Sequence, residues 1–461
     1  MKAFTILTAL LGTALAAPRG FTHVQPIEKS VDRSVENKYT TVKESSKVVV
    51  EEKNTLNGTA TNSRTGNSRV FSINSQKVST QAVQQSIPLK LVNNLDGDLV
   101  NCYISGLDSD GKVVFLGAAG NLIYPSAGGS EVPVTIAEDI AIPMPAKGQT
   151  FEITLPIAMA SGRVYFAQGE LEFFMVKTAT GDGLVQPSNT NLEDPSRNIN
   201  WGFVELTLTT DGVIWANISY VDFVGLIMSM TLRTKDNNTQ EVIGLPGNAV
   251  TTVCEKLLAQ GEVDGLPWGA MCIAGTDGKP LRVLSPEDYG DVAGEGWEDY
   301  WTEYVDKVWE KYSSETLTIK TQAVGDVACK VADNKLTCDG DNRAYPKPDH
   351  LDIWGCNSGP FGIQAEDNAV HVAVVPRLCA AFVRSTLLLD GGNVTPDLPD
   401  TSYYTVSPTS HYSRIIHEEE VDGRGYAFPY DDVNPTGSED AAGLVSSGNY
   451  ESLTFYIGGK Q

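Results

Sequence analysis

The chain has 461 residues and a formal net charge of −24 at pH 7. An acidic surface repels nucleic acids and anionic membranes, so we expect neither as a partner, whereas a neutral polysaccharide or another protein remains compatible. No internal stretch reaches the run of about 18 apolar residues that a membrane-spanning helix needs. The length is sufficient for one large domain or two ordinary ones.

Residues 1–17 have the pattern of a secretory signal peptide. Lys2 supplies the positive charge, residues 4–11 form the apolar segment, and residues 14–16 form a small-x-small cleavage site. We therefore expect a secreted, extracellular protein, with the cell wall as one place of association. Residues 18–80 are rich in Ser, Thr, Asn, Lys and Glu and lack periodicity, which predicts a disordered leader or propeptide.

The rest of the chain predicts a mainly β fold with one insertion. Residues 81–241 contain short Val, Ile, Leu, Phe and Tyr runs between Gly, Pro, Asp and Asn, which is typical of an all-β sandwich or barrel. Within residues 242–316, segments 249–260 and 297–312 have apolar side chains at helical spacing, so we expect a helical or mixed α/β insertion there. The aromatic stripe of the second segment predicts core packing. Strand patterns return over 317–461, the expected second part of the β domain, and a wide groove between the two parts would suit a polymer.

Seven cysteines in an exported chain predict three disulfides and one free thiol. Spacing favours one set of pairs among the many that six cysteines allow: Cys254–Cys272, Cys329–Cys338 and Cys356–Cys379, with Cys102 unpaired. The sequence shows no Cys/His cluster of metal-binding type, so we expect no metal and no cofactor. Glycosylation sequons outside the motif discussed next begin at Asn57, Asn237 and Asn393.

Residues 198–225 form the most informative segment. Glu205 and Asp222 lie on either side of a predicted hairpin in an otherwise apolar or small sequence. A carboxylate in an apolar strand costs free energy unless it is paired or used. Two carboxyls that flank a sugar linkage are the usual machinery of glycoside hydrolysis.

The turn 210–212 fits a three-residue loop that ends on a left-handed glycine, which sets the register of the hairpin. Glu205 then lies opposite Asn217, and Thr207 lies opposite Trp215. The strand period of two places six side chains on one face: Glu205, Thr207, Thr209, Trp215, Asn217 and Ser219. An acid, hydroxyls, an amide and an indole on one surface would suit a sugar ring.

Asp222 does not fit a flat hairpin. It would lie about 16 Å beyond the position opposite Glu205 and on the wrong face. A bulge or bend near Tyr220 and Val221 would have to redirect it. The sequence leaves open whether the carboxyls are about 6.5–9.5 Å apart, as in inverting enzymes, or about 5–5.5 Å apart, as in retaining ones.

Other acidic residues have simpler interpretations. Glu170 and Glu172 alternate in a predicted strand and should face solvent. Asp194 precedes a proline and is typical of a turn. Residues 418–420 form a run of three glutamates that we expect to be solvated.

Four segments resemble the β-1,3-glucanases of glycoside hydrolase family 64. They are GDGLVQPSNTNLEDPSRNINWGFVELT with ANISYVDFVG (within 181–225), CYISGLDSDGKVVFL (102–116) and YSRIIHEEEVDGRGYAFPYDDV (412–433), and the similarity extends over roughly residues 87–459. The last segment also resembles the thaumatin-like proteins to which that family is related. The resemblance implies a thaumatin-like β domain, a second mixed domain and endo-hydrolysis of β-1,3-glucan with inversion.

The resemblance also implies roles for single residues. Glu205 aligns with the general acid, and Asp222 aligns with the general base. Thr207, Trp215 and Ser219 fall at substrate-contacting positions, although Ser219 stands where a threonine is expected and Thr209 where an asparagine is expected. Asn217 begins a sequon inside this motif, and a glycan there would obstruct substrate. We expect Glu205 to carry its proton in apolar surroundings and Asp222 to be ionised.

Two further functions are compatible with the sequence. A non-catalytic thaumatin-like protein that binds β-glucan in defence would share the β domain, but the intact Glu205 and Asp222 pair favours an enzyme. A structural cell-wall protein would be expected to show repeats or a Ser/Thr-rich stalk after the core, and neither is present. We expect the protein to act as a monomer.

Overall fold

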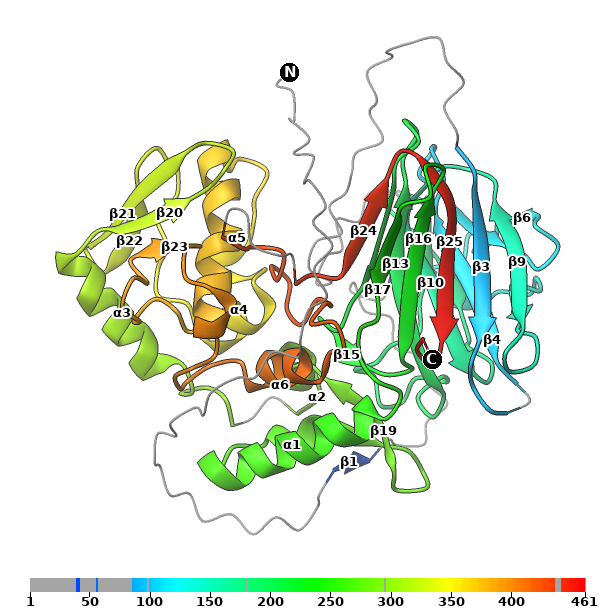
Figure 1. Ribbon diagram of the computed structural model, residues 1–461, viewed down its shortest axis with the longest axis horizontal. Helices are drawn as coiled ribbons and strands as arrows, with labels where there is room; N and C mark the ends of the chain where they lie inside the picture. Colours follow the sequence, from blue (N-terminus) through cyan, green and yellow to red (C-terminus); the bar gives the residue numbers. More distant parts are fainter. Residues whose placement is uncertain are drawn as a thin grey trace.

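The computed structural model describes residues 39–41, 55–56, 85–97, 99–179, 181–293, 296–435 and 441–460. The predicted signal peptide, most of the leader and Asn57 lie outside these ranges. The described chain forms two lobes, one built of long strands and one of helices around a small sheet (Figure 1). The predicted mainly β fold with a mixed insertion is confirmed.

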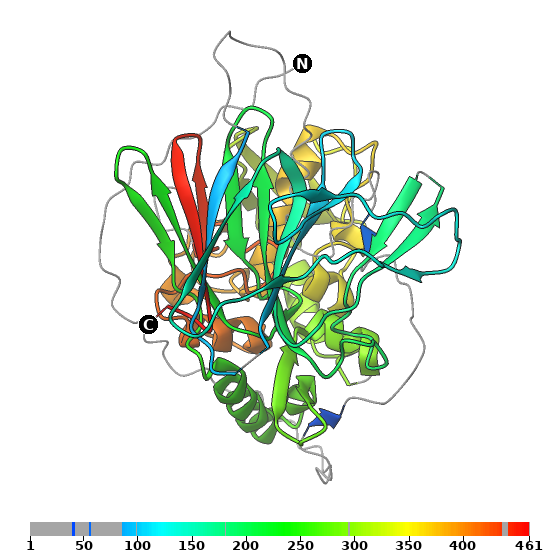
Figure 2. The same ribbon diagram turned by 90° about the vertical axis from the view of Figure 1, so that its right-hand side faces the viewer.

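The β lobe contains two large sheets. The strand order in the first is β24 (Leu444–Ser447), β14 (Ile214–Ile218), β13 (Asn200–Leu208), β10 (Met159–Gln168), β4 (Asn101–Leu107), β5 (Val113–Leu116) and β6 (Leu122–Ile123), with β8 (Ile142–Pro143) beside β4. The order in the second is β17 (Thr239–Val242), β16 (Met228–Thr234), β25 (Tyr450–Ile457), β3 (Ile87–Asn93) and β9 (Thr150–Leu155). Phe166 and Phe455 pack between them with ring centroids 6.1 Å apart. The lobe is therefore an open sandwich without a closed barrel (Figure 2).

Two smaller sheets include pieces of the leader. β2 (Thr55–Leu56) pairs with β12 (Gly181–Val185), which continues to β11 (Phe174–Thr178) and β7 (Val134–Thr135). β1 (Thr40–Thr41) pairs with β18 (Cys272–Ala274), followed by β19 (Pro280–Leu284) and β15 (Phe223–Val224). The prediction of a disordered leader is therefore wrong for these four leader residues, because they add backbone hydrogen bonds to exposed sheet edges.

The second lobe has its own sheet and does not return to the β domain at residue 317. Its strand order is β22 (Lys335–Cys338), β21 (Asp326–Ala332), β20 (Leu317–Lys320) and β23 (Val394–Thr395). Around it lie α3 (Thr302–Ser314), α4 (His350–Gly355), α5 (Ala369–Val383) and the short helices η3 (Gly359–Phe361) and η4 (Asp400–Ser402). Among the described residues after 316, β24 and β25 alone rejoin the large sheets, so the expected boundary at 316/317 misses where the chain comes back.

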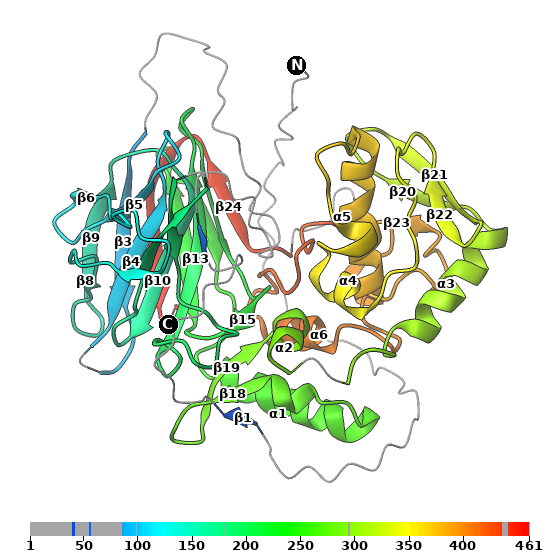
Figure 3. The same cartoon turned by 180° about the vertical axis from the view of Figure 1, so that it is seen from behind.

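Three helices connect the lobes. α1 (Ala249–Asp264), α2 (Pro286–Ala293) and α6 (His411–Glu419) lie below the space between the lobes in Figures 1 and 3. The short helix η2 (Trp268–Met271) follows α1 in the chain. The aromatic stripe before and within α3 is core, as predicted, because Trp297 and Trp301 are 2% and 1% exposed. No helix in the described ranges has the length and apolar character needed to cross a bilayer.

The predicted disulfides are confirmed. Cys254 bonds to Cys272, Cys329 to Cys338, and Cys356 to Cys379. Cys102 is a buried free thiol.

Candidate active site

The hairpin formed by β13 and β14 has the predicted register. Glu205 pairs with Asn217, and Thr207 pairs with Trp215. The turn closes through the Thr209 N–H, which donates to the Val213 carbonyl at 2.9 Å, and Gly212 has the left-handed φ of 80° that the loop needs. The local sequence therefore fixes which side chains share a face.

The two faces of the hairpin differ as the period of two predicts. On the inner face six side chains are no more than 3% exposed: Val204, Leu206, Leu208, Ile214, Ala216 and Ile218. The opposite face is partly exposed, and we call it the polar face: Glu205, Thr207, Thr209, Trp215, Asn217 and Ser219. The predicted residues thus lie together, and their roles remain predictions.

Glu205 has polar neighbours, so the expectation of apolar surroundings is wrong. Arg163 pairs with it from the adjacent strand β10, with 3.4 Å between Nη2 and Oε1. Asn217 Nδ2 donates to Oε2 at 3.3 Å. The Arg163 and Glu205 side chains are only 16% and 13% exposed, so the ion pair is partly shielded from water.

Arg163 is itself held in place, and the sequence interpretation missed it. Its guanidinium lies 4.3 Å from the centre of the Phe203 ring and donates to Gln186 at 3.4 Å. The Tyr165 hydroxyl also donates to Gln186. Gln186 directly follows β12, so the loop after that strand reaches the polar face. The sequence signal that could have identified Arg163 was its place as a basic residue within the apolar segment 159–168.

Asp222 is redirected by a bend, as predicted. After β14 the chain makes a single bridge between Ser219 and Tyr426 and then enters β15, which pairs with β19 in a different sheet. The Tyr412 hydroxyl donates to the Tyr220 carbonyl at 2.6 Å, and the Ser285 N–H donates to the Asp222 carbonyl at 2.8 Å. The change of sheet brings Asp222 to a place where it interacts electrostatically with Glu205 and Arg163.

The surroundings of Asp222 favour its protonated form. Burial raises the pKa of Asp222 well above its ordinary value, and the nearby carboxylates of Asp288, Glu205 and Glu287 add to this, while Arg163 opposes it. These surroundings therefore do not match the expectation that Asp222 is ionised.

The other acidic residues are placed as follows. Glu170 and Glu172 are exposed, as expected. Asp194 accepts the Ser188 and Ser196 N–H groups at 3.2 and 2.8 Å and organises the loop after β12, in line with its predicted place in a turn. Burial raises the pKa of Asp194 to about 6.

The run 418–420 is not freely solvated, which corrects the expectation. Glu418 and Glu419 both pair with Lys256, at 3.0 and 2.5 Å, and Glu420 is buried against His417 at 2.8 Å. Lys256 lies on α1, so its pairs with Glu418 and Glu419 join the end of α6 to α1.

No metal site accompanies the hairpin in the described part of the chain. Across those ranges, no three His, Cys, Asp or Glu side chains are arranged to hold an ion. The groups available at this site are the carboxyls of Glu205 and Asp222 together with an indole, three hydroxyls and one amide of the polar face, and they include a candidate acid and a candidate base.

Comparison with known proteins agrees with this class. The family model of the β-1,3-glucanases of glycoside hydrolase family 64 matches residues 85–457. Glucan endo-1,3-β-glucosidases from Cellulosimicrobium cellulans and from Arthrobacter sp. (strain YCWD3) are each 30% identical over 379 residues, which is 80% of this chain and 64% of theirs. The chain thus spans less than two thirds of these relatives' length.

Solved structures show the same fold. A laminaripentaose-producing β-1,3-glucanase in complex with laminaritetraose is 28% identical with a TM-score of 0.71, covering 81% of this chain and 99% of that chain. A β-1,3-glucanase domain from Clostridium beijerinckii is 18% identical with a TM-score of 0.63, covering 82% of this chain and 100% of that one. The chain belongs to glycoside hydrolase family 64, and the predicted family is confirmed.

Proposed function

We propose that this protein is a secreted endo-β-1,3-glucanase that cleaves its substrate with inversion at the anomeric carbon. The observation that carries the proposal is the hairpin: Glu205 lies on the polar face beside Trp215, and the bend after β14 turns Asp222 toward the same site. Family membership and the similarity to a glucanase that binds laminaritetraose support the substrate class.

In this mechanism the two carboxyls share one proton. The reactive form has the proton on Glu205, which donates it to the leaving glycosidic oxygen. Asp222 accepts a proton from the attacking water while the water oxygen bonds to the anomeric carbon. Because the two carboxyls interact electrostatically, their apparent pKa values belong to the pair and not to either residue alone. The form that reacts is the one with Glu205 protonated and Asp222 ionised.

The remaining residues of the polar face orient the sugar and the acid. The Trp215 indole offers an apolar surface to the ring, and Thr207, Thr209 and Ser219 offer hydroxyls for its oxygens. Arg163 and Asn217 fix the Glu205 carboxyl at 3.4 and 3.3 Å. No step requires a metal ion.

Secretion is part of the same proposal. It is supported by the N-terminal signal pattern and by three disulfides, which persist in oxidising compartments. The polymeric substrate, which does not enter cells, suits an extracellular location.

The test is to incubate the secreted protein with linear β-1,3-glucan and to follow product size and anomeric configuration by NMR. We expect short oligosaccharides released first as the α-anomer, with no products from a β-1,4-glucan control. Initial release of the β-anomer would overturn inversion. Binding without cleavage would instead support a non-catalytic glucan-binding protein.

A further inference from the structure

Helix α2 begins directly against the bend that carries Asp222. β15 pairs with β19 so that Phe223 lies opposite Leu284, and one step further the Ser285 N–H donates to the Asp222 carbonyl at 2.8 Å. Ser285 precedes α2, and its Oγ accepts the N–H of Asp288 at 3.3 Å. One serine therefore joins the backbone of Asp222 to the first turn of α2.

The Asp288 side chain is built into this junction. Asp288 is 5% exposed, and its carboxylate accepts a hydrogen bond from the Asn189 side-chain amide. Asn189 lies on the loop after β12 that also carries Gln186, the partner of Arg163. Burying a carboxylate costs free energy unless it is hydrogen-bonded, and the bond from Asn189 lowers that cost for Asp288.

The titratable groups around Asp222 come from four elements. Arg163 on β10 is the positive charge acting on it, while Glu205 on β13 and Asp288 and Glu287 on α2 are negative. From α6, the buried Tyr412 hydroxyl interacts with both Asp222 and Asp288. Among these charged groups Asp288 has the largest influence on Asp222.

We propose that Asp288 is a positioning residue of the active site: together with Ser285 it fixes Asp222, and its buried negative charge acts on the Asp222 carboxyl. The inference rests on the proposed function and deepens it. As the water oxygen bonds to the anomeric carbon, its proton passes to Asp222, and Glu205 gives its proton to the leaving oxygen. Asp288 exchanges no proton with substrate and acts through Asp222.

The test is the pH profile of kcat/KM for Asp288→Asn on a soluble linear β-1,3-gluco-oligosaccharide. The asparagine keeps an oxygen for Asn189 but removes the charge, so Asp222 should lose its proton at lower pH. Because the pKa of Asp222 is raised, its ionisation forms the alkaline limb of the profile, and we expect that limb to move down by about one pH unit. A substitution that only weakens the fold would lower the rate without moving the limb.

Glu287→Gln is the matched control. It removes a charge from the same turn of α2, but that carboxylate accepts from Asn357 at 3.2 Å and influences Asp222 less than Asp288 does. We expect a smaller shift of the alkaline limb. An alkaline limb that stays in place in Asp288→Asn would overturn the proposal. A shift of the acidic limb alone would show that the charge of Asp288 does not act on Asp222 and would overturn the proposal as well.

A second measurement does not depend on hydrolysis. The folded-state pKa of Asp222 is raised, so its stabilising contribution is complete below the unfolded pKa and is lost as pH rises through the folded pKa. At about pH 8, Asp222→Asn should therefore raise Tm, and it should raise Tm less when Asp288→Asn is already present. Equal increments in the two backgrounds would show that the carboxyls are uncoupled and would overturn the proposal. If the two Tm increments differ but the protein cleaves no glucan, the proposed function would be rejected, while the interaction between Asp288 and Asp222 would stand.

Discussion

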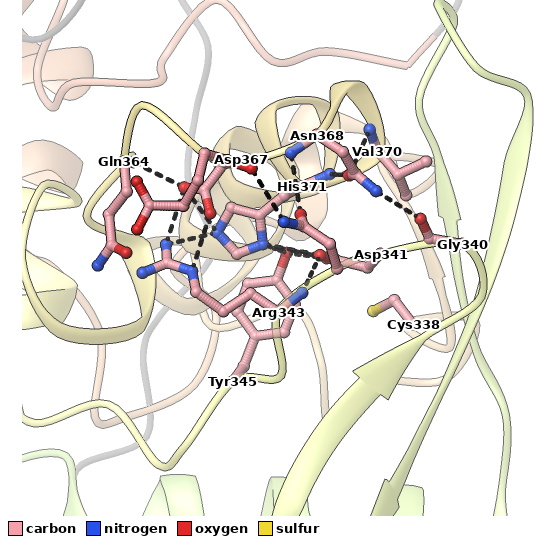
Figure 4. A network of polar contacts seen from close by, with 12 residues as sticks. Cys338, Gly340, Asp341, Arg343, Tyr345, Gln364, Asp367, Asn368, Val370 and His371 are labelled. Carbon is pink, nitrogen blue, oxygen red and sulfur yellow. Dashed lines mark hydrogen bonds and ion pairs between the residues drawn. The ribbon is translucent and has the colours of Figure 1, made fainter.

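Two clusters of charged side chains in this protein look alike in composition and differ in use. One is the candidate active site, where Arg163 pairs with Glu205 and where both of them, with Asp288, act electrostatically on Asp222. The other, which we call the α5 network, joins the loop after β22 to the start of α5 (Figure 4): Asp341, Arg343, Tyr345, Asp367 and His371. Each contains carboxylates, one arginine and a tyrosine.

In the α5 network each acid has its own hydrogen-bonding or ion-pair partners. Asp341 accepts from the Tyr345 hydroxyl at 2.6 Å and lies 3.0 Å from His371 Nδ1, while Asp367 lies 3.2 Å from Arg343. His371 is 0% exposed, and its ring stacks on Tyr345 with centroids 5.0 Å apart. Every acid faces a basic side chain, so the network has a structural role in holding the loop to the helix.

The candidate active site has an excess of acid. One guanidinium lies among several carboxylates, and Glu205 lies on a sheet face that is partly open to solvent. Carboxylates that lie close together raise one another's proton affinity, which is typical of sites that transfer protons. The pairing of the charges and their exposure, more than the kinds of residue present, therefore separate the proposed catalytic cluster from the α5 network.

The largest expected effect is on the rate of hydrolysis by Asp222→Asn. Losing the base should reduce kcat about 10³-fold or more, while the fold is kept because the amide matches the carboxylate in size. Rates on linear β-1,3-glucan and circular dichroism would check this. Wild-type activity in this variant would remove Asp222 from the mechanism.

The reverse result is expected for the α5 network. Asp341→Ala removes a buried acceptor from both the Tyr345 hydroxyl and His371 and should lower the free energy of unfolding by about 3 kcal/mol. Urea unfolding measures this, with the exposed neighbour Asp339→Ala as control. Glucan hydrolysis well below Tm should be kept. A loss of activity without a loss of stability would make the network part of the catalytic machinery.

Trp215→Ala sharpens the comparison on the polar face. Removing the indole should raise KM about tenfold and change kcat less, since the ring binds ground state and transition state alike. The KM of Trp215→Phe should lie between the values for the wild-type protein and for Trp215→Ala. Steady-state kinetics on a soluble oligosaccharide would decide, and an unchanged KM with a lowered kcat would contradict a binding role.

The smallest effect concerns glycosylation. Asn217 donates to Glu205 at 3.3 Å on the polar face, so an active protein should carry no glycan there, whereas Asn237 is exposed in a turn. Peptide mass mapping of the secreted protein should find Asn217 bare, and Ser219→Ala, which removes the sequon, should leave the glycan mass unchanged. A glycan on Asn217 of active protein would contradict the assigned face.

The sequence predicts what depends on local pattern. The turn at Gly212 and the alternation of faces follow from residues adjacent in the chain. The bend before Asp222 was inferred only because pairing Asp222 with Glu205 requires it. Arg163 and Asp288 were missed because their partners come from distant segments: Arg163 bonds to Glu205 across 42 positions, and Asn189 bonds to Asp288 across 99.

The same limit applies to the fold. Strand patterns after residue 317 were recognised, but a pattern does not state which sheet a strand joins, and β20 to β23 form their own. Thr40–Thr41 and Thr55–Leu56 pair through backbone groups, which the polar composition of the leader does not reveal.

The most direct test of the central claim compares two substrates for Glu205→Gln. If Glu205 is the acid, this variant should lose cleavage of linear β-1,3-glucan by about 10²-fold or more, because the leaving sugar oxygen needs a proton. It should largely keep cleavage of a β-1,3-gluco-oligosaccharide with a dinitrophenyl leaving group, which departs without one. Equal loss on both substrates would contradict Glu205 as the general acid.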